Sequence, residues 1–286
     1  MAYQSSTGRT LLWGGLAVGT GSGRDTWEWD GDGWIQVADT GPESMIYAGL
    51  AFDSVRNVAV LFTQNTAGTV WETWEWDGAW TQIEDTGPQT NQAAFQLVYD
   101  AAREVTLLEG GAVAGAMGGY TPVGTWQWDG TSWTQVADTG APARLLGGLA
   151  YDANRERVVL FGGANLDYTY ETDTWEWDGN DWEQVTNIGP PARLAHGMTG
   201  TSGDTLLFGG VSDASPTDTN QFRDTWTWDG THWHQRQDMG PSPRWVMPLV
   251  WDSARERGVI FGGGHVPPGQ PNYILLGDTW ESFETP

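Results

Sequence analysis

The stretch Thr-Trp-Glu-Trp-Asp-Gly at residues 26–31 decides the fold, because it returns along the whole chain. Five further copies, three of them altered, occupy residues 73–78, 125–130, 174–179, 225–230 and 279–283. Successive copies lie about 50 residues apart, a period typical of one supersecondary unit stacked on copies of itself. The sequence therefore predicts a repeat architecture.

Residues 144–189 show what one repeat contains. An apolar run at 145–152 is followed by a polar turn and by the strand-forming run Val-Val-Leu-Phe at 158–161, which a Gly pair ends. In Asp-Thr-Trp-Glu-Trp at 173–177 large and polar residues alternate, which is the pattern of a strand, and the following Asp-Gly favours a hairpin. With a fourth strand at 182–189, each repeat is predicted to be four short antiparallel strands.

Four-stranded sheets at this period indicate a β-propeller rather than a solenoid, whose repeats are shorter and need capping units. Six second-strand cores can be counted, at residues 11–13, 60–62, 106–108, 159–161, 206–208 and 259–261. We therefore expect an all-β, six-bladed β-propeller of four-stranded antiparallel blades, with residues 1–286 as a single domain. The first and last blades are expected to be incomplete.

The repeats resemble the kelch family of β-propellers. The resemblance rests on an Arg that opens the first strand (Arg144, Arg193 and Arg244), Phe-Gly-Gly after the second, an aromatic pair in the third and a Trp opening the fourth. Met45 and Gln92 stand at the Arg position in two other blades, and Glu109 replaces an aromatic residue. The resemblance implies that the Arg positions hold acidic ligands.

Composition excludes several classes of function. The net charge is −24, and all thirteen basic residues are Arg, so neither nucleic acid nor an anionic membrane is an expected partner. There is no Cys and therefore no disulfide or thiol chemistry. We find no signal peptide and no apolar stretch of about 20 residues that could span a membrane, and the sequence leaves the compartment unknown.

Most of the twenty Trp residues recur at equivalent positions, which favours packing between blades. Trp245 departs from this pattern, since it directly follows the first-strand Arg244 and could line the mouth of a central channel. Asp residues of the repeat, among them Asp173 and Asp224, are interpreted as turn residues.

Strand polarity places the fourth-to-first and second-to-third connections on the same side of each blade. Six connections there vary in length and sequence, and variable loops on a rigid scaffold commonly carry binding sites. Arg144, Arg193 and Arg244 belong to this side and could bind a carboxylate or another oxyanion. Alternatively, each Arg pairs with a local carboxylate or carbonyl and braces its own blade.

His265, in the last variable loop, is a weak candidate for acid–base catalysis, because its reference pKa is close to neutral. His232 and His234 have the spacing of metal ligands but no third ligand, and the Asp-rich turn at 30–33 has too few ligands for calcium. No metal and no cofactor are therefore expected.

We first expect a binding module whose ligand, a glycan or a peptide with acidic or hydroxyl groups, contacts Arg144, Arg193, Arg244, Trp245 and His265. The kelch resemblance implies a second possibility, a mutarotase or isomerase acting on sugar acids. The kelch family also includes copper oxidases, whose cofactor chemistry uses a Cys, and this chain has no Cys. A third possibility is a self-assembling scaffold. We expect a monomer, with oligomers through an exposed strand edge as the alternative.

Overall fold

The computed structural model describes the chain except residues 18–20, 44–47, 66, 85, 90–91, 115–119, 139–140, 142–143, 238–239 and 283–286. Met45 thus lies outside the described residues. The described residues form strands and turns, and none of them forms a helix that could cross a membrane. Contacts divide the chain into two compact units, unit 1 (Met1–Asp138) and unit 2 (Thr139–Pro286). A single domain of six blades stays a prediction.

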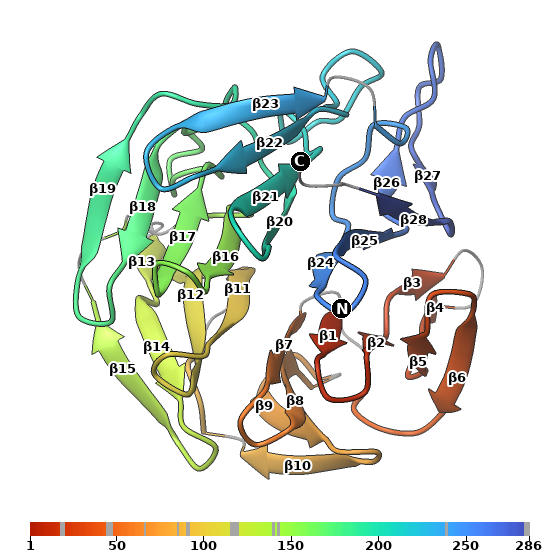
Figure 1. The fold of residues 1–286 in the computed structure, drawn as a ribbon, viewed down its shortest axis with the longest axis vertical. Coiled ribbons are helices and arrows are strands. Elements are labelled where there is room, and N and C mark those ends of the chain that lie inside the picture. Colours follow the sequence, from red (N-terminus) through yellow and green to blue (C-terminus); the bar gives the residue numbers. More distant parts are fainter. Residues whose placement is uncertain are drawn as a thin grey trace. The chain divides into compact units, whose positions relative to one another are not determined.

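Unit 1 contains three blades, whose strands pair antiparallel in chain order (Figure 1). Blade 1 consists of β1 (Ala2–Gln4), β2 (Arg9–Trp13), β5 (Thr26–Trp29) and β6 (Trp34–Ala38). Blade 2 consists of β7 (Ala48–Asp53), β8 (Val58–Gln64), β9 (Trp71–Trp76) and β10 (Trp80–Glu84). Blade 3 consists of β11 (Gln92–Asp100), β12 (Val105–Ala114), β14 (Thr125–Trp128) and β15 (Trp133–Ala137). The loops add β3 (Leu16–Ala17), β4 (Gly21–Ser22) and β13 (Tyr120–Pro122).

Unit 2 contains the other three blades. Blade 4 consists of β16 (Gly148–Asp152), β17 (Arg157–Phe161), β18 (Thr174–Trp177) and β19 (Trp182–Thr186). Blade 5 consists of β20 (Gly197–Gly200), β21 (Thr205–Phe208), β22 (Thr225–Trp228) and β23 (Trp233–Gln237). Blade 6 has β24 (Leu249–Asp252), β25 (Arg257–Phe261) and β28 (Thr279–Ser282), with a loop hairpin of β26 (Gly264–His265) and β27 (Ile274–Leu275).

These elements confirm an all-β propeller fold of six blades. The predicted second-strand cores fall within β2, β8, β12, β17, β21 and β25. Side chains of these strands, such as Leu11, Leu107 and Val159, are fully buried. The core of each blade is therefore its second strand, because the burial of its apolar side chains away from water stabilises the packing of the sheets.

In blades 2, 3 and 5 the recurring Trp that opens the fourth strand joins its blade to the preceding one. In unit 1, Trp133 Nε1 donates to Thr73 Oγ1 of the preceding blade at 2.8 Å. In unit 2, Trp233 Nε1 donates to Thr174 Oγ1 at 2.9 Å. The indole packs against its neighbours while its N–H is satisfied by a buried hydroxyl. Packing between blades, as predicted, is thus the role of these repeated Trp side chains.

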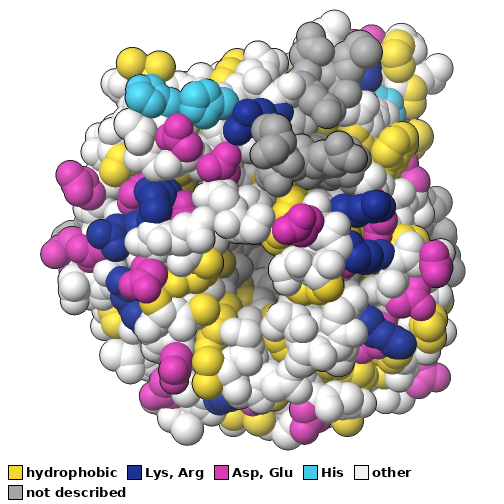
Figure 2. Space-filling model, in the orientation of Figure 1, with side chains coloured by type: hydrophobic (Ala, Val, Ile, Leu, Met, Phe, Trp, Pro, Cys, Tyr) yellow, Lys and Arg dark blue, Asp and Glu magenta, His cyan; other side chains and the backbone are white. Residues whose placement is uncertain are grey.

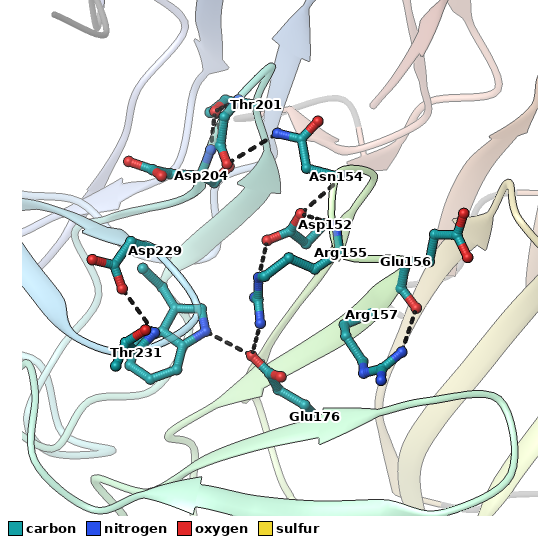
Figure 3. Close-up of polar contacts among 12 residues, drawn as sticks. Asp152, Asn154, Arg155, Glu156, Arg157, Glu176, Thr201, Asp204, Asp229 and Thr231 are labelled. Carbon is teal, nitrogen blue, oxygen red and sulfur yellow. Dashed lines mark hydrogen bonds and ion pairs between the residues drawn. The ribbon is translucent and has the colours of Figure 1, made fainter.

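A second link between blades lies at the turns joining first and second strands. Arg155 donates from Nε to Asp152 Oδ2 at 2.8 Å and from Nη1 to Glu176 Oε1 at 2.5 Å (Figure 3). The same Glu176 oxygen accepts the indole N–H of Trp228, in the next blade, at 2.8 Å. Figure 2 shows basic side chains lying beside acidic ones in this view. The Asp-x-x-Arg turn of blade 4 therefore contains a local ion pair, which also connects to the next blade through Glu176.

Candidate binding face of unit 2

The five predicted site residues lie on one set of connections in unit 2. Bridges join Leu145 to Ala164, Leu194 to Val211, and Trp245 to Gly264, so each fourth-to-first connection pairs with the second-to-third loop of its blade. We name the unit 2 loop face as the segments 144–146, 193–195 and 244–246 together with the loops 164–172, 211–223 and 264–277.

Three residues with left-handed backbone hold consecutive blades together on this face. Leu146, Ala195 and Val246 have φ angles of 57°, 56° and 50°. Such angles are uncommon for residues with a side chain and are retained where surrounding structure imposes them. Here Ala195 N donates to Leu146 O, and Val246 N donates to Ala195 O, each at 2.8 Å. The three connections therefore lie side by side.

Arg193 and Arg244 are fully buried, and each forms an ion pair with an aspartate of its own blade. Arg193 donates from Nη1 to Asp224 Oδ1 at 2.7 Å and from Nη2 to Oδ2 at 2.9 Å. Arg244 makes the same two bonds to Asp278, at 2.9 and 3.1 Å. Each guanidinium also donates to a glycine carbonyl at the end of the second strand, 3.0 Å away. This bidentate geometry fixes the side chain and neutralises its charge.

Arg144 is also buried, and its Nη2 donates to Asp173 Oδ2 at 2.5 Å. Its Nη1 donates to Asn165 of the adjoining loop. Burial lowers the pKa of the Arg144 guanidinium, and the charge of Asp173 opposes that effect. In all three blades the contacts match the alternative in which the Arg braces its own blade.

The aspartate partners correct one sequence interpretation. Asp173 and Asp224 were predicted to serve turns, but each accepts bonds from its Arg and from the Trp two residues later. Trp175 Nε1 and Trp226 Nε1 reach them at 2.7 Å. Burial raises the pKa of Asp224, but hydrogen bonding and the charge of Arg193 outweigh it, so the net pKa is lowered. The recurrence of Asp two residues before Trp in the Arg-bearing blades was the signal in the sequence.

The variable loops of blades 5 and 6 are joined by a side-chain amide. Gln221 donates from Nε2 to Val266 O at 2.9 Å, and its Oε1 accepts from Val266 N at 2.8 Å. Asp218 also accepts from Gly269 N at 2.9 Å. On the other side, Tyr170 of blade 4 accepts a bond from Ala214 N at 3.2 Å. The loops therefore form a connected surface.

The same amide sets the tautomer of His265. Because Gln221 Oε1 accepts from a backbone N–H, it is the amide oxygen, and an oxygen of this kind cannot donate. His265 Nδ1, 3.2 Å away, must therefore be the donor. In the neutral form of this half-buried imidazole, Nε2 is then a hydrogen-bond acceptor.

An apolar group lies beside His265. Trp245 is only 9% exposed, and its ring meets Tyr273 edge-on with centroids 6.0 Å apart. A Cβ at Gly264 would come within 2.7 Å of the indole, so the absence of a side chain there lets Trp245 lie against the backbone. The connection that carries Trp245 and the hairpin that carries His265 also have exposed side chains that the sequence reasoning missed, namely Val246 (65%), Tyr273 (62%), Ile274 (47%) and Leu275 (37%). For the last three, the signal was an apolar run, Tyr-Ile-Leu-Leu at 273–276, in a loop rich in Pro and Gly.

The charge of the loops is mainly negative. Asp167, Asp213 and Asp218 are exposed, and Arg223 is an exposed cation among them. Within the described part of the chain no three His, Cys, Asp or Glu side chains gather as metal ligands. On β23, outside this face, His234 Nε2 contacts Asp229 Oδ2 at 2.9 Å. The face thus combines aromatic and aliphatic side chains with hydrogen-bond acceptors and carboxylates.

No family model matches the chain, and no curated protein matches it. Among solved structures, one described as the structure of YjhT is similar, with a TM-score of 0.72 and 11% sequence identity. The match covers 96% of this chain and 92% of that chain. At this identity the likeness shows the fold alone.

Proposed function

We propose that the chain is a kelch-like interaction module whose unit 2 loop face binds a glycan or a peptide. The observation that carries this proposal is the set of exposed apolar side chains, Val246, Tyr273, Ile274 and Leu275, on the segments that carry Trp245 and His265, in loops held together by backbone and amide hydrogen bonds. Aromatic side chains that are exposed on a rigid support are frequent binding anchors. The propeller fold itself supports a general binding or scaffold role.

The contacts divide the predicted residues into two roles. Arg144, Arg193 and Arg244 act as positioning residues, since their guanidiniums already bind aspartates and hold the loop bases. Trp245 and His265 contribute to ligand contact through the indole and the Nε2 acceptor, and Tyr273 joins them. Neutralised arginines favour hydroxyl or peptide groups over a strongly acidic ligand.

The proposal is tested by screening the protein on a glycan array and a peptide array. The variant Tyr273→Ala/Val246→Ser removes exposed apolar surface without touching the buried pairs, so it should lose the signals that the wild type gives. Val55→Ser is the matched control, because Val55 is 57% exposed in a turn of unit 1. Identical signals from the wild type and the double variant would overturn the placement of the site.

A further inference from the structure

The strand β27 has an inner edge paired with β26 and an outer edge. The alternation of backbone N–H and C=O groups along the strand shows which residues face which edge. Leu276 N donates to Gly263 O at 2.9 Å, and Asp278 O accepts from Gly262 N at 3.0 Å. In an antiparallel strand the N–H and C=O of one residue point to the same side, and the next residue points to the other. Ile274, paired with His265, therefore faces β26 together with Leu276 and Asp278, while residues 273, 275 and 277 face outward.

That outer edge has no strand beside it in the described part of unit 2, where β27 pairs with β26 alone. Tyr273, Leu275 and Gly277 are all exposed. Their amides and carbonyls have the spacing of an antiparallel ladder. The edge is therefore a template for one more extended segment.

Side chains on one face of the hairpin define what such a segment must carry. Leu275 is the cross-strand partner of Gly264, over which the Trp245 indole lies, and Tyr273 shares the face of Leu275 because it is two residues away. Trp245 packs edge-on against Tyr273 and supports it. Tyr273 and Leu275 would contact every second side chain of an added strand. Those side chains should be apolar.

Charge selects the remaining side chains of the partner. Exposed Asp213 and Asp218 belong to the loop that contacts Gly269 of the hairpin, and the whole protein carries a net charge of −24. An acidic segment would be repelled, and a basic one attracted, in a manner that salt weakens.

We propose that an extended segment of a partner protein, alternating apolar and basic residues, adds as a strand to the outer edge of β27. The inference rests on the proposed function and names its ligand class. Backbone hydrogen bonds to residues 273, 275 and 277 align the segment, and Tyr273 and Leu275 contact its apolar side chains. The net negative charge of the protein favours basic side chains at the remaining positions.

The first test uses fluorescein-labelled heptapeptides from a library that alternates Leu, Val or Ile with Lys or Arg. Fluorescence anisotropy should detect binding that weakens with salt, and peptides with Glu in place of Lys and Arg should bind at least about tenfold more weakly. Two N-methylated versions of a binding peptide are compared, one methylated at the odd-numbered amides and the other at the even-numbered amides. One version should lose binding and the other should keep it, because only one of the two sets of amides faces β27. Equal effects of both methylation patterns, or no binding by any member of the library, would overturn the proposal.

The second test changes the edge in the protein. Leu275→Pro removes an outward N–H that β26 does not use, so the hairpin should remain while peptide affinity falls by about tenfold or more. Leu275→Ala keeps the N–H and is the matched control for the lost side chain. Hydrogen exchange should slow at residues 273–277 when peptide is added to the wild type. Proline and alanine variants of equal affinity would refute strand addition.

The two proposals can fail separately. If array ligands are lost with Tyr273→Ala/Val246→Ser but are unaffected by Leu275→Pro, the loop face binds ligands without strand addition, and only this inference falls. If neither variant changes any ligand, the proposed function falls as well.

Discussion

Blade 5 in unit 2 and blade 3 in unit 1 have the same strand order but fill three equivalent positions with different chemistry. Blade 5 has Arg193, Asp224 and Phe208, whereas the sequence of blade 3 has Gln92, Gly124 and Glu109. The cation and its carboxylate are replaced together, and the aromatic residue becomes an acid. The four strands form in both blades, so the buried ion pair is not what specifies the sheet.

In the two blades the indole N–H of the equivalent Trp donates to different acceptors. Trp226 Nε1 donates to the Asp224 carboxylate at 2.7 Å, while Trp126 Nε1 donates to the carbonyl of Val123 at 2.9 Å. Glu109, buried in blade 3, accepts the Thr125 hydroxyl at 2.5 Å. Unit 2 thus keeps its buried charges in pairs at the loop bases, while in blade 3 Glu109 relies on hydroxyl and backbone donors. This difference predicts how each unit responds to mutation and pH.

The largest effect should come from breaking the pair in blade 5. Arg193→Ala leaves Asp224 without its two guanidinium bonds, so the free energy of unfolding should fall by about 3–5 kcal/mol. The double variant Arg193→Gln/Asp224→Gly reproduces the residues of blade 3 and should cost less than Arg193→Ala, because it leaves no unpaired charge. Chemical denaturation followed by circular dichroism measures both.

The control is Arg257→Ala, which removes a cation that is 56% exposed and 3.4 Å from Glu281. A pair of this kind contributes up to about 1 kcal/mol. The comparison of the two blades fails if Arg193→Ala costs no more than Arg257→Ala.

Blade 3 should show its difference in the pH dependence of stability. Burial raises the pKa of Glu109 from 4.5 to about 7, although Thr125 and the backbone of Gly110 lower it in part. A folded-state pKa above the unfolded one means that the native state holds the proton more tightly. Stability is therefore lost as pH rises from 4.5 through 7, by roughly 3 kcal/mol in full.

Glu109→Gln removes this titration and should flatten the decline between pH 5 and pH 8, as thermal unfolding at several pH values will show. Glu183→Gln, at an exposed position on β19, serves as the control and should leave the decline unchanged. An identical slope in the wild type and Glu109→Gln would show that the carboxyl is already ionised in the folded protein.

Blade 5 should respond to acid in the opposite direction through His196. Burial, with the nearby Arg193 charge as a smaller cause, lowers the pKa of this imidazole from 6.5 to about 3. The unfolded state then binds the proton more tightly, so stability is complete above pH 6.5 and declines as pH falls. Between pH 6.5 and pH 5 the loss should be roughly 2 kcal/mol.

His196→Met is the appropriate variant, since Met247 occupies the equivalent buried position in blade 6. It should be less sensitive to acid than the wild type in the same unfolding measurements. A variant that declines with acid as steeply as the wild type would mean that His196 is not the responsible group.

Sequence patterns predicted the blades because each depends on local chemistry. The alternation of the Trp-x-Trp strand and the Asp-Gly turn are both visible in neighbouring residues. The strand pattern recurs in β5, β18 and β22, and the turn directly follows each of these strands. That each Arg braces its own blade was one of the two sequence alternatives, but Asp224 was not identified as the partner of Arg193, because 31 residues separate the two side chains. The hairpin of β26 and β27 occurs outside the repeat pattern. The left-handed backbone of Leu146, Ala195 and Val246 recurs two residues after each Arg, but the residue types there differ and the conformation depends on tertiary hydrogen bonds.

The smallest effect concerns a type of hydrogen bond that occurs within each of the two units. Trp133→Phe in unit 1 and Trp233→Phe in unit 2 each remove an indole N–H from a buried threonine hydroxyl, at Thr73 and Thr174. Each should lower the free energy of unfolding by about 1 kcal/mol, and by the same amount in both units, because the two bonds have nearly the same length. Adding Thr73→Val to Trp133→Phe should recover part of the loss, since the orphaned hydroxyl is then removed too. Denaturation midpoints that differ strongly between the two Phe variants would show that the units differ in how their blades are joined, and not only in how their charges are buried.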